Sequence, residues 1–143
     1  MIPAPRCAHD GQSEPERAQG VYPPESCSLE AWSEDEENYC ILHSREPNKP
    51  NKKIERALSD VSGIVTGAKF HDIDDATDLD FEETSLPRAD FSGSSLRGVS
   101  FNGALLAGAD FSNTDLKSAT FVDNTTLRDA LFDNSYCNQT EFQ

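Results

Sequence analysis

The stretch ADFSGSSLRGVSFNGALLAGADF, residues 89–111, carries a large apolar residue at every fifth position. Phenylalanine and leucine alternate at these positions, which are Phe91, Leu96, Phe101, Leu106 and Phe111. A regular strand does not suit this pattern, because side chains five residues apart point to opposite faces. An α-helix does not suit it either, since five residues turn the chain by about 500° and the large residues form no stripe. The period therefore indicates an internal repeat.

The repeat extends beyond this stretch in both directions. From Leu79 to Phe121 the large residue is the third of each five, a usually small side chain lies two positions before it, and polar residues or glycine follow. After Phe121 the spacing lengthens once to six residues, and the period of five resumes at the central positions Leu127, Phe132, Cys137 and Phe142. One extra residue with an intact pattern on both sides predicts a local bulge or loop.

The units ADFSG, ADFSN, TDLKS and ATFVD, which begin at residues 89, 109, 114 and 119, resemble the A(D/N)Lxx motif of the pentapeptide-repeat family. The resemblance covers roughly residues 79–143, and AKF at 68–70 is a weaker, irregular match. It implies a mainly β fold, a right-handed quadrilateral β-helix with four pentapeptides in each coil. The central and small positions of each repeat would then point inward.

Four repeats in a coil place residues twenty apart above one another, so the alternation predicts four interior columns. Two columns consist of phenylalanine: Phe81, Phe101, Phe121 and Phe142 in one, and Phe91, Phe111 and Phe132 in the opposite one. The other two are mostly leucine: Leu86, Leu106 and Leu127 in one, and Leu96, Leu116 and Cys137 in the other. Equal volumes that stack from coil to coil suit close packing. Buried cysteine behaves as a small apolar residue, so we expect Cys137 in the core.

The sequence divides into three regions. These are a Cys/His-rich module at 1–48, a linker with a short helix at 49–67, and the β-helix at 68–143. Polar, proline-rich composition before the repeat is typical of loops, and REPNKPNKK has the composition of a linker. The segment KKIERALSDV has Ile54, Leu58 and Val61 at helical spacing, so we expect a short helix that Gly63 or Gly67 ends.

Three cysteines and two histidines lie in the N-terminal module. Cys40-x-x-His43 has a two-residue gap that lets both side chains turn onto one ion. With Cys7 and Cys27 they make three thiolates and one imidazole, a set that binds zinc tetrahedrally, and His9 could replace Cys7. The layout C…W…YCILH is similar to small Cys/His modules that precede pentapeptide repeats in some prokaryotic proteins.

The energetics of the module also favour a metal. A segment of this length with few apolar residues, among them Trp32, Tyr39, Ile41 and Leu42, cannot bury a self-sufficient core. A bound metal would supply the missing stability, because its binding energy becomes folding energy. The protein would fill every ligand position, so we expect a structural zinc ion rather than a catalytic one. Unrelated free thiols and a disulfide are the alternatives.

A second polar cluster lies in FHDIDDATDLD, which places His71 among acidic residues. Five carboxylates there could offer oxygen ligands to a cation: Asp72, Asp74, Asp75, Asp78 and Asp80. An EF-hand loop needs glycine at its sixth position, and this run, counted from Asp72, has Thr77 there, so we expect a solvated acidic entry to the β-helix. No GxSxG, P-loop, HExxH or dinucleotide-binding motif occurs, so we expect a non-enzyme without catalytic residues.

The charge favours some partners over others. The chain has 26 acidic and 12 basic residues, for a formal net charge of -14. This balance opposes binding to a phosphate backbone and suits a salt-adapted surface, a basic partner or simple solubility. We rank the salt-adapted surface first, so a halophilic source is a hypothesis. The polar N-terminus resembles no secretory signal and no apolar run could span a membrane, so we expect a cytoplasmic protein.

Three functions are compatible with these features. In the first, the rod is a scaffold that presents polar faces to a protein partner through Asp80, Glu82, Arg88, Arg97, Lys117 and Arg128. In the second, it mimics DNA and occupies the DNA groove of a type II topoisomerase such as gyrase, as some pentapeptide-repeat proteins do. The thirteen central positions give a rod of only about 15 Å, which opposes this second function. The third, zinc-dependent nucleic-acid binding, rests on few basic residues: Lys49, Lys52, Lys53 and Arg56.

The sequence stops at Gln143, one residue after a central phenylalanine, and shows no capping helix or polar terminal repeat. An open coil exposes strand edges and apolar side chains. We expect either that this end pairs with a second copy, which would give a homodimer, or that the sequence is a piece of a longer protein.

Overall fold

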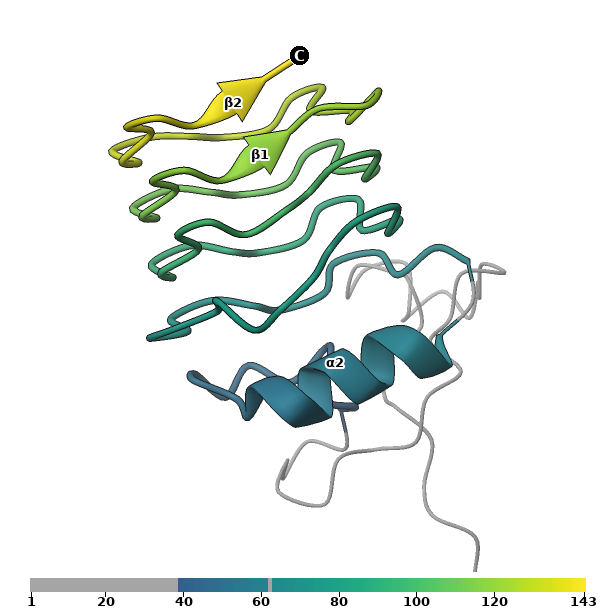
Figure 1. Cartoon of the computed structure of the whole chain (residues 1–143). Coiled ribbons are helices and arrows are strands. Elements are labelled where there is room, and N and C mark those ends of the chain that lie inside the picture. The colour runs from purple at the N-terminus through teal and green to yellow at the C-terminus, as the bar shows by residue number, and fades with distance from the viewer. Residues whose placement is uncertain (1–38, 62) are drawn as a thin grey trace, which may run out of the picture.

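The computed structural model describes residues 39–61 and 63–143. In this part of the chain the elements are α2, Asn51–Asp60, followed by β1, Thr120–Phe121, and β2, Glu141–Phe142. Figure 1 shows α2 across one end of a stack of coils, and the chain winds from there to its C-terminus at the other end. Within the same described residues, no helix has the length and hydropathy that crossing a lipid bilayer requires.

Successive coils run side by side and parallel. A backbone bridge joins Asp90 to Asp110, twenty positions further along the chain. The N–H of Phe91 donates to the carbonyl of Asp110 at 2.8 Å, and the N–H of Asp110 donates to the carbonyl of Ala89 at 2.9 Å. A shift of twenty residues equals four repeats, so a regular coil contains four pentapeptides, as the sequence predicts.

The extended segments are short because every repeat contains a turn. Among the described residues only β1 and β2 pair over two positions, with Thr120 opposite Glu141 and Phe121 opposite Phe142. The other paired positions are isolated parallel bridges. The β structure in residues 39–61 and 63–143 therefore consists of one- and two-residue extended segments between turns rather than of long strands.

Each repeat turns at the second residue after the central one, where the backbone φ is positive. Glycine takes this corner in the middle coils, with φ of 70° at both Gly93 and Gly103. A side chain at Gly93 would contact Asp72 Oδ1 of the preceding coil, so that carboxylate would have to rotate aside. Asparagine, which tolerates this conformation better than most residues, follows at Asn113 and Asn134.

The aspartate of the ADF units has a local role in these turns. Asp90 Oδ1 accepts hydrogen bonds from the N–H of Ser92 at 3.0 Å and from its hydroxyl at 2.6 Å. Asp110 Oδ1 accepts from the N–H of Ser112 at 2.8 Å. An aspartate in this position forms an Asx turn, which stabilises the start of the corner made by the next residues.

The phenylalanines form two continuous stacks inside the coils, as predicted. In one column the ring centroids of Phe81 and Phe101 are 5.2 Å apart, and those of Phe101 and Phe121 are 4.8 Å apart. In the other column Phe91 and Phe111 stack at 4.8 Å. The two columns meet edge to face across the interior, with 5.3 Å between the centroids of Phe91 and Phe101. All five rings are buried, and each aromatic pair adds about 0.5–1.5 kcal/mol beyond its buried area.

One interior column departs from the prediction at its last member. Leu96 and Leu116 are fully buried, whereas Cys137 is exposed, so the prediction that Cys137 belongs to the core is wrong. A central residue is buried when coils lie on both sides of it, and Cys137 lies in the last described coil with a neighbour on one side. In the same coil Phe132 is only partly buried and Phe142 is 49% exposed.

The six-residue spacing after Phe121 forms a local loop, as predicted. Asp123 and Asn124 both have positive φ, so the loop turns at two consecutive residues. The hydroxyl of Thr125 lies inside the loop, where its oxygen accepts a hydrogen bond from the N–H of Gly103 at 3.0 Å. The extra residue is thus accommodated at a corner, and the pairing of β1 with β2 shifts by 21 residues instead of 20.

A further coil precedes the regular repeats and contains a second extra residue. The N–H of Ala76 donates to the carbonyl of Ser95 at 3.1 Å, which is the bond that a central residue makes. The N–H of Ile73 donates to Ser94 Oγ at 2.8 Å, so Ile73 lies over the small position of the next coil. In this coil the large residue Ile73 therefore occupies the small position, and the small residue Ala76 occupies the central position. Both residues are buried.

α2 covers the first coil. Ile54 and Ala57 on one side of the helix are buried, and Leu58 and Val61 pack partly against the same core. The N–H of Val61 donates to the carbonyl of Ala57 at 3.0 Å. The predicted short helix is confirmed, although it ends at Asp60 rather than at either glycine.

Candidate functional site

A tight turn places Cys40 and His43 together. The N–H groups of His43 and Ser44 both donate to the carbonyl of Cys40, at 3.0 and 2.8 Å. The turn brings Cys40 Sγ to 3.3 Å from His43 Nδ1, and both residues are buried. Two of the four predicted zinc ligands therefore lie side by side.

The other ring nitrogen of His43 determines which tautomer faces the thiol. His43 Nε2 lies 3.0 Å from the carbonyl oxygen of Thr66, which can only accept a hydrogen bond. In the neutral ring Nε2 therefore carries the hydrogen, and Nδ1 presents its lone pair to Cys40. Metal-binding histidines are commonly oriented by such a bond from the second nitrogen to a backbone carbonyl.

The distance between Sγ and Nδ1 fits two arrangements. Thiolate and imidazole ligands at about 2.3 and 2.0 Å from a tetrahedral zinc ion lie about 3.5 Å apart. A weak hydrogen bond from the thiol to the imidazole also fits the observed 3.3 Å. The remaining predicted ligands, Cys7, Cys27 and the substitute His9, lie outside the described residues. Within 39–61 and 63–143, no group of three or more His, Cys, Asp or Glu side chains could hold a metal ion.

Lys49, which the sequence places in a linker, is buried beside this turn. Its Nζ donates to the carbonyl of Ser44 at 2.9 Å and also to the carbonyl of Lys69. The N–H of Lys69 in turn donates to the carbonyl of Leu42 at 2.6 Å. These bonds attach the turn to the first coil, and they remove Lys49 from the exposed basic residues considered for nucleic-acid binding.

The acidic run after Phe70 uses its carboxylates in local turns. Asp80 Oδ1 accepts from the N–H of Glu82 at 2.9 Å. Asp75 Oδ1 accepts from the N–H of Thr77 at 3.0 Å, and this bond, together with one from the Thr77 hydroxyl, holds the pKa of Asp75 below its ordinary value. Both carboxylates thus act as turn caps, which supports the expected solvated entry to the coils.

The outward residues form rows along the stack. Bridged positions lie above one another, and one such row reads Lys69, Asp90, Asp110 and Leu131. A second row is uncharged and reads Ile64, Ser85, Leu105 and Thr126. Lys69 Nζ lies 3.8 Å from Asp90 Oδ2, so the first row contains an ion pair. Ile64 is 53% exposed and Leu105 is 46% exposed, so different rows present different chemistry to a partner.

The six outward residues that the sequence proposes for partner contacts all face the surface to some degree. Lys117 is half-buried, and the others are exposed: Asp80, Glu82, Arg88, Arg97 and Arg128. Arg97 Nε lies 3.7 Å from Asp115 Oδ2, so its charge is partly compensated. The sequence alone gives no signal for this pair, because the two residues belong to different coils.

A comparison with known protein families agrees with the five-residue period of the sequence. Residues 77–113 and 94–134 match the family described as Pentapeptide repeats, with eight copies. A search among characterised proteins gives no significant match. The matched region begins just after Ala76, where the first coil exchanges its large and small residues, and the coiling itself extends beyond the match at both ends.

Proposed function

Because residues 77–134 carry pentapeptide repeats, we propose that the chain is a non-enzymatic interaction module, or scaffold, whose rod is a right-handed quadrilateral β-helix. The observation that carries this proposal is the filled interior, since the phenylalanine and leucine columns of the middle coils are buried. Contact with a partner is then left to the outward rows, which the backbone holds in register. A protein partner would meet side chains spaced at about 4.8 Å along one row.

A photo-reactive amino acid in one row at a time tests this proposal. Arg88 and Arg97 are both exposed and lie two repeats apart, so they face different sides of the rod. In extracts of the source cells we expect one discrete protein to crosslink from one of these positions and not from the other. The proposal fails if no position on any row yields a discrete crosslinked protein.

We further propose a structural zinc ion bound by Cys40 Sγ, His43 Nδ1, Cys7 and Cys27, with His9 as a substitute for Cys7. The 3.3 Å separation of Sγ from Nδ1 supports it, as does the bond from Nε2 to the first coil. The ion would tie the N-terminal module to the coils, because the imidazole contacts both. Its binding energy would then contribute to folding.

Metal analysis of the purified protein tests the zinc site. We expect about one equivalent of zinc in the wild type and its loss in Cys40→Ser and in His43→Gln. The matched control is Cys137→Ser, which removes an exposed thiol of the last coil and should keep the metal. Much less than one equivalent in the wild type, or equal loss in the control, would contradict the site.

A second candidate function is an acidic DNA mimic that acts on a type II topoisomerase such as gyrase. It rests on the net charge of -14, and the consecutive Asp90 and Asp110 of one row favour it. Lys69 and Leu131 interrupt the acidic character of this row at its two ends, which favours the scaffold. A supercoiling assay with gyrase separates the two, because a scaffold predicts no inhibition even at high protein excess.

The proposed partners include a second copy of the chain. Phe142 is 49% exposed, whereas Phe101 and Phe121 of the same column are buried. A second copy would cover this ring, as further coils would. The mass in solution tests the pairing: a dimer that Phe142→Glu dissociates is expected, and a strict monomer would contradict it.

The last two proposals are a cytoplasmic location and a salt-adapted surface. The excess of acidic residues supports the second, because acidic surfaces remain solvated in concentrated salt. Stability that increases when salt is added is the expected result, and unfolding on addition of salt would contradict it.

A further inference from the structure

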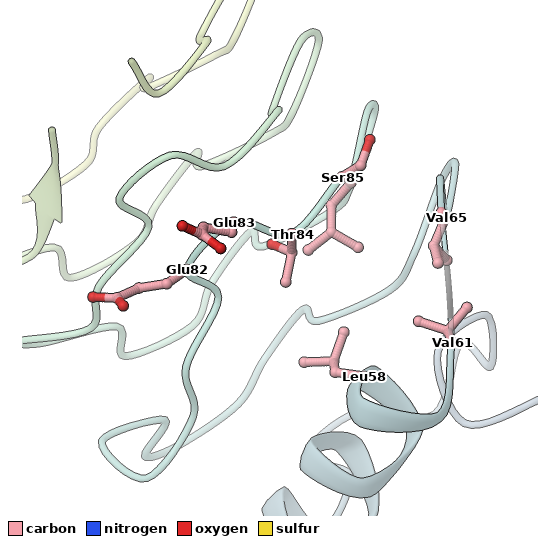
Figure 2. A pocket seen from close by; sticks show the side chains of 9 residues that line it. Leu58, Val61, Val65, Glu82, Glu83, Thr84 and Ser85 are labelled. Atoms are coloured by element: carbon pink, nitrogen blue, oxygen red, sulfur yellow. The ribbon is translucent and has the colours of Figure 1, made fainter. Parts of the chain in front are cut away.

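A cavity of about 370 Å³ opens between the C-terminal end of α2 and the coils that α2 covers (Figure 2). Its apolar wall consists of Leu58, Val61, Val65 and Leu86, and Glu82 and Glu83 line another part. We call this cavity the α2 groove. It uses none of the residues proposed for zinc binding.

The groove exists because α2 stops before it has covered the whole coil. The helix ends at Asp60, and the chain turns at Gly63, where φ is 89°. A Cβ placed on Gly63 would have no atom of the described residues within 4 Å. Leu58 and Val61 consequently remain partly exposed, while Val65 and Leu86 below them are core residues.

The groove is anionic as well as apolar. The carboxylates of Glu82 and Glu83 are exposed, and neither forms an ion pair with any residue in the described part of the chain. Ser100 Oγ of the next coil donates to Glu82 Oε1 at 2.7 Å, so this carboxylate is held at the outer end of the groove and points away from Leu58 and Val61 (Figure 2). The last turn of α2 contains no basic residue, so the partial negative charge at its C-terminus adds to that of the carboxylates.

We propose that the α2 groove binds an arginine or lysine side chain from a basic segment of a partner protein. The methylene stem of such a side chain suits the wall of Leu58 and Val61, and its charged head would extend along the coil to the carboxylates of Glu82 and Glu83 at the outer end of the groove (Figure 2). Arginine fits best, because a guanidinium pairs with carboxylates through two parallel hydrogen bonds. The net charge of -14 would also steer a basic segment toward the protein. The inference rests on the proposed role as an interaction module and names the chemistry of its partner.

Titration of the full chain with a blocked peptide of alternating leucine and arginine tests the groove, with backbone amide NMR as the readout. We expect the largest shifts at Leu58, Val61 and Thr84. Matched peptides that replace every arginine with glutamate, or every leucine with serine, should bind weakly, because each lacks one half of the required chemistry. Shifts spread evenly over all acidic corners of the rod would overturn the proposal, because they would indicate non-specific attraction.

Two variants separate the groove from general charge effects. Glu82→Gln with Glu83→Gln should weaken peptide binding about tenfold, and glutamine can still accept the bond from Ser100. The matched control, Asp133→Asn with Glu141→Gln, removes the same charge from exposed residues of the last coil and should leave the affinity unchanged. Equal weakening by both pairs would overturn the proposal.

Ser85→Lys gives an independent test, because it places a tethered ammonium group at the wall of the groove. We expect this variant to melt like the wild type by circular dichroism and to lose the peptide-induced shifts. If Ser85→Lys binds the peptide as the wild type does, the groove is not the site. A partner crosslinked equally well by wild type and by Ser85→Lys would leave the scaffold role intact while excluding the groove.

Discussion

The middle coils and the first coil bury similar cores by different means. In the middle, each large residue stacks on one of the same type twenty positions further on, as Phe91 stacks on Phe111 at 4.8 Å. In the first coil the period fails, and Ser94 Oγ from the next coil bonds both the N–H of Ile73 and the carbonyl of Phe70. The regular coils thus stack like residues throughout, whereas the first coil keeps one such stack, Phe70 on Phe91 at 5.0 Å, and uses a side-chain hydroxyl where its extra residue lies.

Breaking a middle column should have the largest effect. Phe101→Ala removes a fully buried ring that contacts rings above, below and across the interior. We expect the free energy of unfolding, measured by urea denaturation, to fall by about 3–5 kcal/mol. The control Phe142→Ala removes a ring that is 49% exposed and should cost about 1 kcal/mol. Similar losses in the two variants would mean that the columns do not carry the stability.

The next largest loss of stability is expected at Gly93, a corner of the second coil that faces the first coil. Gly93→Ala adds backbone strain at a positive φ and forces the Asp72 carboxylate of the first coil to rotate aside, and we expect a loss of about 2 kcal/mol. Gly98 has a similar φ of 68° but open space around it, so Gly98→Ala should cost only about 1 kcal/mol. Adding Asp72→Ala should recover part of the Gly93→Ala loss in thermal melts. Equal costs at the two glycines would exclude contact between coils as the cause.

The loss of one hydroxyl should destabilise the first coil more than the last coil. Ser94→Ala leaves the N–H of Ile73 and the carbonyl of Phe70 without the hydroxyl that bridges them, and we expect a loss of about 1–3 kcal/mol. Ser135→Ala removes a hydroxyl from the last coil, where it bonds the carbonyl of Phe132 and lies near Cys137 Sγ. This control should cost about 0.5 kcal/mol. A larger loss in the control would contradict the role assigned to Ser94.

The smallest effect concerns the acid limb of the pH–stability curve. The backbone and hydroxyl of Thr77 hold the pKa of Asp75 below its ordinary value of 3.8. A carboxylate with a lowered pKa stabilises the fold above the unfolded pKa, and this contribution is lost as the pH falls through the folded pKa. Asp75→Asn should therefore make stability slightly less dependent on pH below 3.8, measured by thermal melts at several acidic pH values. A steeper acid limb in the variant would contradict the assigned direction.

The sequence predicts the middle coils well because their information is local. Period, residue size and the extra residue after Phe121 can all be read along the chain, and the stacking follows from them. The first coil is harder to predict from the sequence, because Ile73 occupies a small position, Ala76 occupies a central one, and an extra residue interrupts the five-residue spacing. Cys137 was misplaced for another reason: its position in the repeat is correct, but burial depends on a coil on each side.

The candidate site also has one part that the sequence predicts and other parts that it does not. The Cys-x-x-His spacing correctly suggests that Cys40 and His43 can meet, because a turn of that length brings the two side chains together. The burial of Lys49 could not be read from a proline-rich, basic segment, since its partners are carbonyl groups of Ser44 and Lys69. The α2 groove was also missed, because it depends on where α2 ends relative to Glu82 and Glu83.

Photo-crosslinking from Arg88 and Arg97 tests whether the outward rows of a rigid rod carry the proposed function, when the wild type is compared with Phe101→Ala at a temperature that unfolds only the variant. We expect a partner to crosslink from one side of the folded rod and not to crosslink to the unfolded variant, because binding needs the rows in register. Crosslinking without preference for a side, or crosslinking that persists in the unfolded chain, would contradict it.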